Sequence, residues 1–508
     1  MKLACQCFQH LNSSPLRHLL FAFLAVAYLV AINSAADAAP LPALRQLAKT
    51  AQVSALVVNL DNMQTIAAIN PGKRLTPASV SKLFTTAAAL RQFGPGHRFI
   101  TRLTTRGSVS GGTLHGNLSL IGSGDPMLNV EDLHHLAQRL RARGIQNITG
   151  NLVINASHFG HVPCLTPDRC QAKSQSSHAY DAPLSAVGLG YGTLHATVYP
   201  GPRPGTSTHV VLHPLGMAGY HIDNRSRTHG ATSHPALRAW RTTGKHQTVL
   251  HIRGQLPAGG KPVELFRSVA KPGRETAYAM NRILADAGIH VQGVARITRH
   301  RKPATQSRTI TLARIKSRTL AAQLIPMLAF SNNYMADTLT LDIATAKGMR
   351  PPLTLPEAAQ PLEHLGRRVR RQIFGAAAGQ SAPTFASGSG LSTRNQVSAR
   401  DLVALLAAMY RDSALFPAFY GALPVPRYAP EKMLKHANSA FLNRLTAKTG
   451  TLHDPVSARS LAGYMRTQNH GFLAYAVLIN GTSNHPHPGF YNTVGAYESD
   501  LEHLLARH

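Results

Sequence analysis

The stretch "TPASVSKLFTTAAAL", Thr76 to Leu90, places Ser79 three residues before Lys82. Residues three apart are neighbours on a helix, so a helix here puts Lys82 one turn beyond Ser79. A helix is predicted because apolar residues recur at the i, i+3, i+4 spacing, at Val80, Leu83, Phe84, Ala87 and Ala88. A serine beside a basic side chain at a helix start is one way to make a nucleophile. A capping serine and a solvated lysine give the same spacing by chance, so the rest of the chain must decide.

The length of 508 residues predicts more than one domain, or one domain with a large insertion. From Ala51 the sequence predicts two strands joined by a turn at Asp61-Asn62, ahead of the Ser79 helix. Short strands with some helices follow, and residues from about 184 to 260 are all β in pattern. Beyond about residue 308 the pattern is helical, and the C-terminal part returns to antiparallel strands before a last helix.

The N-terminus resembles an export signal. Lys2 and Arg17 precede the apolar run "LLFAFLAVAYLVAI", Leu19 to Ile32, and Ala36-Asp37-Ala38 offers a cleavage site. The run of 14 residues is shorter than a membrane span requires. We therefore expect a cleavable signal peptide at residues 1–38 and an exported, periplasmic protein.

Two cysteines remain in the chain after this signal, Cys164 and Cys170 in "CLTPDRC". A disulfide closing this short loop is the prediction for an oxidising compartment, and two unpaired thiols are the alternative. The pair has no matching partners for a zinc site.

The chain carries 53 Lys and Arg residues against 22 Asp and Glu, a formal net charge of +31. Nucleic acid is the first partner such a balance suggests. The export signal, the low aromatic content of 6% and the dispersed basic residues argue against it. A loose association with an anionic wall or membrane surface fits better. The 27 histidines and scarce carboxylates also suit an acidic exterior, where few carboxylate pairs would be lost to protonation.

Two further motifs follow Ser79 in chain order. "SNN", Ser331 to Asn333, lies in a predicted helical region, and "KTGT", Lys448 to Thr451, lies on a predicted strand. Serine-x-x-lysine, serine-x-asparagine and lysine-threonine-glycine, in this order, form the signature of penicillin-recognising serine acyl-transferases. Each motif alone is weak, but the three in order behind an export signal are specific.

The chain resembles the class C low-molecular-mass penicillin-binding proteins, the D-alanyl-D-alanine carboxypeptidase/endopeptidase family. The 248 residues between Lys82 and Ser331 fit its large insertion, and "IGSGDPML", "SGSGLSTRNQVSARDLVALL" and "LAGYM" are similar to its other conserved stretches. The match runs in patches over nearly the whole mature chain. Ser387 stands where the family usually has aspartate, and Asn151 and Asn155 stand where acids are usual, which concerns substrate detail more than chemistry.

This resemblance implies an α/β (α+β) fold of the penicillin-binding and serine β-lactamase-like transpeptidase type, an antiparallel sheet flanked by helices. Two nested, mostly β inserted domains are expected. The acyl-transferase domain is assigned to residues 39–93 and 308–508, the first inserted domain to 94–183 and 261–307, and the second to 184–260.

The resemblance also implies roles for the motif residues. Ser79 Oγ attacks the penultimate D-alanine carbonyl, Lys82 acts as the base in its neutral form, and Ser331 relays a proton to the leaving amine. Substrate is held by Asn333, Lys448, Thr449 and Gly450. The backbone N–H groups of Ser79 and Thr451 form the oxyanion hole. No metal or organic cofactor is required.

The leading hypothesis is therefore a serine D-alanyl-D-alanine carboxypeptidase, with DD-endopeptidase activity as an extension, that trims peptidoglycan stem peptides and is inhibited by β-lactams. A β-lactam hydrolase is disfavoured because no Glu-x-x-x-Asn deacylation motif stands out between Lys82 and Lys448. A non-catalytic wall-binding protein is disfavoured because the motif residues are intact.

Overall fold

The computed structural model describes residues 41–171, 178–213, 220–244, 248–299, 309–376, 382–429, 434, 437–468 and 471–508. The expected signal peptide, residues 1–38, lies outside them. Across the described residues, no helix is both long and apolar enough to cross a membrane.

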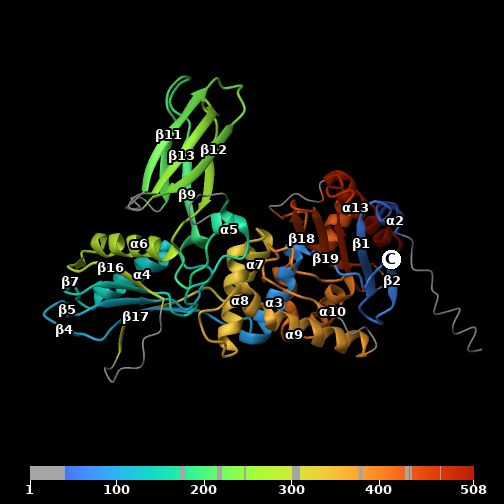
Figure 1. Cartoon of the computed structure of the whole chain (residues 1–508), viewed down its shortest axis with the longest axis horizontal. Coiled ribbons are helices and arrows are strands. Elements are labelled where there is room, and N and C mark those ends of the chain that lie inside the picture. The colour runs from blue at the N-terminus through green and yellow to red at the C-terminus, as the bar shows by residue number, and fades with distance from the viewer. Residues whose placement is uncertain are drawn as a thin grey trace, which may run out of the picture.

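A five-stranded antiparallel sheet joins the two ends of the chain (Figure 1). β1, Gln52–Asn59, pairs with β2, Thr65–Ile69, on one side and with a strand near the C-terminus on the other. The order is β18-β19-β20-β1-β2, where β18 is Leu445–Leu452, β19 is Ala458–Arg466 and β20 is Phe472–Asn480. The central strands are buried on both faces, which explains their continuous apolar runs. The predicted strand pair before the Ser79 helix and the predicted three C-terminal strands are confirmed.

Helices cover both faces of this sheet. One face packs on α2, Pro42–Leu47, and α13, Phe490–Arg507. The larger core on the other face is built by α3, Lys82–Phe93; α7, Leu320–Ala329; α8, Asn333–Ala346; α9, Leu355–Phe374; α10, Ala399–Tyr410; and α11, Phe416–Ala422. This helix-sheet-helix sandwich positions α3 and α8 next to each other.

The inserted segment contains a second five-stranded sheet, order β16-β8-β6-β3-β17, covered by α4, Val130–Ala142, and α6, Pro272–Asp286. Its strands are β3, Ile100–Thr105; β6, Leu118–Ile121; β8, Leu152–Asn155; β16, Ala295–Thr298; and β17, Ile310–Lys316. Beside it lies a four-stranded sheet of β4, Ser108–Ser110; β5, Thr113–His115; β7, Asn147–Ile148; and β15, His290–Val291.

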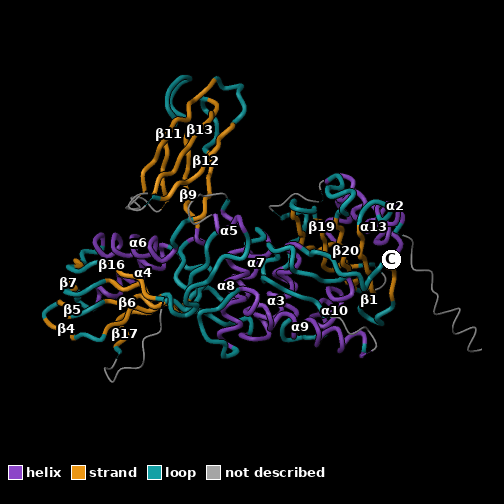
Figure 2. Tube along the Cα trace, in the orientation of Figure 1, coloured by secondary structure: helices purple, strands orange, loops and turns teal. Residues whose placement is uncertain are grey.

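Two three-stranded sheets form a β-rich projection that rises above the rest of the inserted segment (Figure 2). They consist of β9, Thr193–Tyr199; β10, His209–His213; β11, Tyr220–His229; β12, Ala236–Thr243; β13, Thr248–Pro257; and β14, Val263–Ser268. β14 pairs with β9, so this part extends beyond residue 260. β17 pairs with β3 and so lies in the inserted sheet, although residues from 308 were assigned to the outer domain.

The predicted helix around "SNN" is interrupted. Asn332 caps α8 by accepting a hydrogen bond from Met335 N, and Ser331 has a φ of 52°, in the left-handed region. A non-glycine residue rarely adopts this conformation, which ends α7 and turns the chain into α8. Ser331 and Asn332 thus lie in a turn, and only Asn333 lies within the helix.

Two buried carboxyl groups meet where the inserted segment contacts α8. A Cβ added at Gly124 would lie 2.1 Å from Asp342 Oδ1, so the loop that carries Asp125 packs closely on the helix. Burial raises the pKa of Asp125 to about 7. Burial, and then the nearby Asp125 charge, raise the pKa of Asp342 well above its usual value. His158, 3.1 Å from Asp342, has a pKa lowered by burial.

We predict that Asp125→Asn removes a pH-dependent contribution to stability. Because the folded-state pKa of Asp125 is raised, its contribution is fully present below about pH 4 and is lost as the pH rises through about 7. Asparagine cannot ionise, so the variant should gain about 2–4 kcal/mol of unfolding free energy relative to wild type between pH 4 and pH 8. Urea unfolding at the two pH values measures this.

The exposed Asp286→Asn variant serves as the control. Removing the Asp125 charge also takes away one cause of the raised pKa of Asp342, which changes the stability difference in the same direction. His158 titrates in both proteins, so its contribution largely cancels in the comparison. A stability difference between wild type and Asp125→Asn that is the same at both pH values would contradict the assignment.

Candidate active site

Ser79 lies in a short 3₁₀ turn, η1, Ala78–Ser81, directly before α3. The residue before it, Ala78, has a φ of 49°, a conformation that costs a non-glycine residue about 1–3 kcal/mol. Gly390 makes this turn sterically feasible, because a Cβ there would lie 1.9 Å from Ala78 O. Packing therefore holds the turn in a strained form and leaves Ser79 half-buried at the start of a buried helix.

Lys82 is fully buried and its ammonium nitrogen reaches three acceptors. Nζ lies 2.9 Å from Ser79 Oγ, 2.7 Å from Asn333 Oδ1 and 2.8 Å from the Ser389 carbonyl oxygen. The two acceptors other than Ser79 come from segments more than 250 residues away and orient the side chain toward the hydroxyl. At this distance a neutral amine can take the Ser79 proton, and burial of the nitrogen opposes its positive charge.

The start of α8 positions Asn333 in contact with Lys82. Asn333 is the first residue of the helix and is buried, and its Nδ2 donates to Tyr180 O at 3.4 Å. Ser331 lies two residues earlier, in the strained turn between α7 and α8. The last residues of α7, Leu328 and Ala329, line a small cavity together with Lys448 and Thr449, so this turn lies beside the Lys-Thr-Gly strand.

β18, the edge strand of the central sheet, carries the third motif. A Cβ at Gly450 would lie 2.6 Å from Pro77 O and 3.0 Å from Ser79 N, so only glycine permits the strand to approach the nucleophile this closely. Lys448 is buried and its Nζ donates to the Thr449 carbonyl oxygen at 2.9 Å. The prediction that this motif lies on a strand is confirmed, and that strand is at the edge of the sheet.

The loop before α10 packs against the candidate active site through its backbone. Besides the Ser389 carbonyl on Lys82, its Gly388 carbonyl accepts a hydrogen bond from Thr85 Oγ1 at 2.9 Å. A Cβ at Gly388 would lie 1.9 Å from Thr340 Oγ1, so glycine allows the loop to pack between α3 and α8. The backbone of this stretch therefore contacts the candidate base, Lys82, directly.

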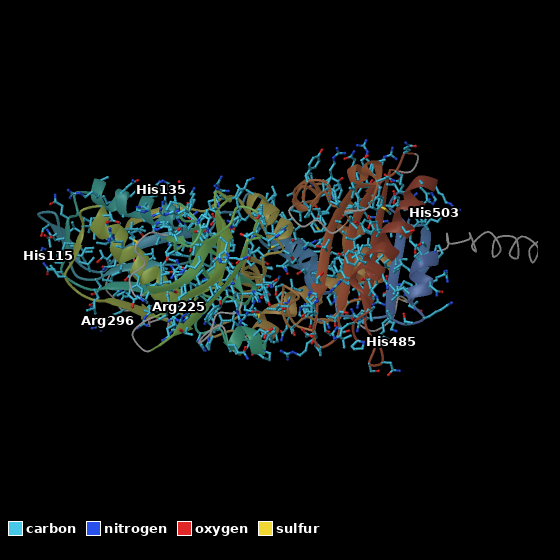
Figure 3. All side chains as sticks on the ribbon, turned by 90° about the horizontal axis from the view of Figure 1, so that it is seen from above. His115, His135, Arg225, Arg296, His485 and His503 are labelled. Atoms are coloured by element: carbon cyan, nitrogen blue, oxygen red, sulfur yellow. A yellow bond between two sulfur atoms is a disulfide. The ribbon has the colours of Figure 1, made fainter. Side chains whose placement is uncertain are left out.

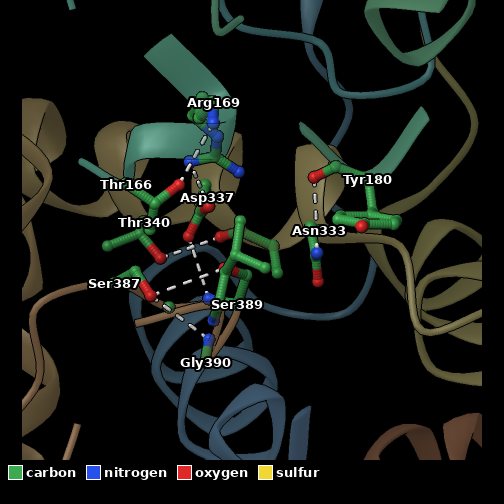
Figure 4. A network of polar contacts seen from close by, with 12 residues as sticks. Thr166, Arg169, Tyr180, Asn333, Asp337, Thr340, Ser387, Ser389 and Gly390 are labelled. Carbon is green, nitrogen blue, oxygen red and sulfur yellow. Dashed lines mark hydrogen bonds and ion pairs between the residues drawn. The ribbon is translucent and has the colours of Figure 1, made fainter. Parts of the chain in front are cut away.

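A buried ion pair supports this loop (Figure 4). Asp337 of α8 accepts a hydrogen bond from Ser389 N at 2.9 Å and pairs with Arg169 Nη1 at 2.9 Å. The Asp337 side chain is 0% and that of Arg169 2% exposed. A continuous series of contacts therefore runs from Arg169 through Asp337 and Ser389 to Lys82.

Arg169 belongs to the inserted segment. It lies in α5, Pro167–Gln171, inside the loop that the Cys164–Cys170 disulfide closes, with the two Cα atoms 5.2 Å apart. Together with Tyr180 O on Asn333, this loop places two parts of the insertion against the candidate site.

The structure thus brings Ser79, Lys82 and Asn333 into direct contact and lays Gly450 against the serine. The relay role of Ser331 and the oxyanion role of Ser79 and Thr451 remain predictions. Sequence reasoning missed three contributors: Ser389, Asp337 and Arg169. The signal for Arg169 was its place inside the two-cysteine loop. Ser389 acts through its backbone, which no residue type marks.

An antiparallel sheet between helix layers, a serine–lysine pair at a helix start and a Lys-Thr-Gly edge strand define a serine acyl-transfer enzyme of the penicillin-binding type. The chain belongs to the D-Ala-D-Ala carboxypeptidase 3 (S13) family, whose model matches residues 39–497.

Two relatives and one solved structure illustrate the family. The chain is 30% identical over 427 residues to a D-alanyl-D-alanine carboxypeptidase of an Actinomadura species, covering 81% of this chain and 74% of the relative. It is 25% identical over 445 residues to D-alanyl-D-alanine carboxypeptidase DacB of Haemophilus influenzae, covering 86% and 87%. The crystal structure of penicillin binding protein 4 (dacB) from Haemophilus influenzae shares the fold, with a TM-score of 0.71 at 21% identity over 91% of this chain and 99% of that one.

We predict that Arg169→Met slows acylation of Ser79 by a labelled penicillin. The substitution leaves Asp337 as an uncompensated buried charge, which typically costs about 3–5 kcal/mol and displaces the Ser389 loop that orients Lys82. The acylation rate constant should fall at least about tenfold at a temperature where the variant is folded. Arg169→Lys keeps the positive charge and should recover part of the rate.

Arg282→Met is the matched control, because it breaks an exposed ion pair on α6 that contributes about 1 kcal/mol or less. Wild-type acylation by folded Arg169→Met protein would refute a positioning role for Arg169.

Proposed function

We propose that this protein is a periplasmic serine D-alanyl-D-alanine carboxypeptidase that trims peptidoglycan stem peptides through a Ser79 acyl-enzyme. The observation that carries the proposal is the 2.9 Å contact between Lys82 Nζ and Ser79 Oγ beside the edge strand β18. Family membership and the names of the relatives support the reaction class. The export-like N-terminus supports the location.

The reaction follows from the site geometry. Neutral Lys82 accepts the Ser79 proton while Oγ attacks the carbonyl carbon of the penultimate D-alanine. The peptide C–N bond breaks, and the leaving D-alanine amine takes up the proton from Lys82, with Ser331 as the relay. Water then attacks the ester, and its proton returns through Lys82 to Ser79, which frees the shortened peptide and restores the enzyme.

The edge strand supplies the binding groups. An extended peptide can lie along β18, where Gly450 leaves room for its backbone. Lys448 and Thr449 hold the free C-terminal carboxylate, and Asn333 holds the peptide amide. The N–H groups of Ser79 and Thr451 stabilise the oxyanion, an interaction typically worth ~3–4 kcal/mol.

β-Lactams are proposed as inhibitors because their strained amide reacts with the same serine. A penicillin binding protein 4 from Haemophilus influenzae with 22% identity to this chain has been crystallised in complex with a β-lactam. Endopeptidase activity on cross-linked stem peptides follows from the same acyl-enzyme when the leaving amine belongs to a neighbouring peptide.

The test combines substrate turnover with penicillin labelling. The wild-type protein should release D-alanine from a peptide ending in D-Ala-D-Ala and leave a matched L-Ala-L-Ala peptide intact. Labelled penicillin should form a stable adduct, and a cross-linked dimer tests the endopeptidase activity. Ser79→Ala should lose at least about 10³-fold in D-alanine release, with unfolding behaviour close to wild type.

The alternatives give different results. Rapid loss of the penicillin label with release of hydrolysed drug would identify a β-lactam hydrolase. Neither labelling nor D-alanine release by folded protein would indicate a non-catalytic wall-binding protein.

A further inference from the structure

Two adjoining cavities lie on the inserted segment, and the larger one is also lined by the end of α8. They have volumes of about 960 Å³ and about 700 Å³, and Ile100 and Arg102 of β3 line both. The combined feature is called the arginine groove, and its arginines are Arg102, Arg139, Arg143, Arg299, Arg314 and Arg350.

The described residues lining the arginine groove include positively charged side chains without acidic ones among them. Within the described part of the chain, no Asp or Glu residue lines either cavity, and none of the six arginines forms an ion pair with a carboxylate. All six are exposed. Gathering like charges in a concave site is unfavourable by itself and concentrates a positive potential there.

Concavity distinguishes these arginines from the rest of the basic surface. Exposed basic residues are spread over the whole molecule, as Arg225, Arg296 and His485 illustrate (Figure 3). Arg225 is close to a carboxylate, 3.3 Å from Asp223. The groove instead collects guanidinium groups from β3, α4, β17 and the segments after β16 and α8 around one hollow. A planar guanidinium group can donate two parallel hydrogen bonds to one carboxylate or phosphate group.

α8 connects the groove to the candidate active site. Its first residue, Asn333, contacts Lys82, and its last turn and the following residues, Thr345 and Gly348 to Pro352, line the larger cavity. A helix of 14 residues is about 20 Å long, so the two sites lie about that far apart along the helix.

We propose that the arginine groove is a secondary binding site for carboxylate groups of the peptidoglycan strand whose stem peptide occupies the active site. This inference rests on the proposed function, which makes a polymer with many stem-peptide carboxylates the substrate. A ligand with repeated carboxylates can occupy both sites at once, which raises the effective concentration of its scissile peptide at Ser79. A short soluble peptide cannot span the two sites.

The test compares polymeric and soluble substrates in a charge-matched pair of variants. The groove variant carries Arg102→Gln, Arg299→Gln and Arg350→Gln. The control carries Arg203→Gln, Arg411→Gln and Arg507→Gln, three exposed arginines outside the groove, and loses the same charge. Rates are measured on insoluble peptidoglycan and on a soluble D-Ala-D-Ala pentapeptide at low and high salt.

The groove variant should show KM for peptidoglycan raised about tenfold, equivalent to about 1.4 kcal/mol of lost binding, with unchanged kinetics on the pentapeptide. Its salt dependence on peptidoglycan should be weaker than that of wild type. The control variant should remain close to wild type on both substrates. Peptidoglycan amidated only at the side-chain carboxyl groups of its stem peptides, with the terminal D-alanine carboxylate left free, should bind wild type as weakly as untreated peptidoglycan binds the groove variant.

Equal weakening in the two variants would assign the effect to dispersed charge and overturn the proposal. So would an unchanged KM in the groove variant, or full binding of amidated peptidoglycan. Competition by a phosphate polymer without any effect of amidation would overturn the choice of carboxylate. Inactivity of wild type on the pentapeptide would instead count against the proposed function, so the two failures are distinguishable.

Discussion

The arrangement of this protein depends on keeping one lysine amine buried and aimed at one serine hydroxyl. Lys82 has no exposed surface, yet its nitrogen lies within 2.9 Å of Ser79 Oγ, Asn333 Oδ1 and the Ser389 carbonyl. A buried amine is tolerated only when hydrogen bonds replace its lost hydration. The partners that stabilise Lys82 are therefore the same groups that position it, and they come from the start of α8 and the loop before α10.

The inserted segment takes part in this arrangement. Asp337 lies one helical turn beyond Asn333 on α8, and it binds both the Ser389 loop and Arg169 of the disulfide-closed loop. The other end of α8 borders the arginine groove. One helix therefore links the candidate nucleophile, the insertion and a positively charged hollow, which gives the insertion a physical connection to catalysis and to polymer binding.

Local patterns predicted a large part of this structure. Apolar periodicity indicated α3 and the paired strands β1 and β2, and the order of three short motifs pointed to Ser79, Lys82 and the edge strand. The turn at Ser331 was missed because polar residues in a helical pattern do not reveal a left-handed backbone. β17 pairs with β3, which lies more than 200 residues earlier, so the boundary expected at residue 308 falls inside the inserted domain. The sequence around a strand does not show which distant strand it pairs with. The Arg169–Asp337 pair joins residues 168 apart, and the Ser389 contact uses a carbonyl that every residue possesses.

Mapping the modified residue in protein acylated by a β-lactam tests the central claim most directly. Peptide mass spectrometry of wild type and Lys82→Met, treated in parallel and shown to be folded, identifies the acylated residue and its rate of formation. We expect an adduct on Ser79 in wild type and a rate at least about 10³-fold lower in the variant. An adduct on another residue, or equal rates of Ser79 acylation in the two proteins, would contradict it.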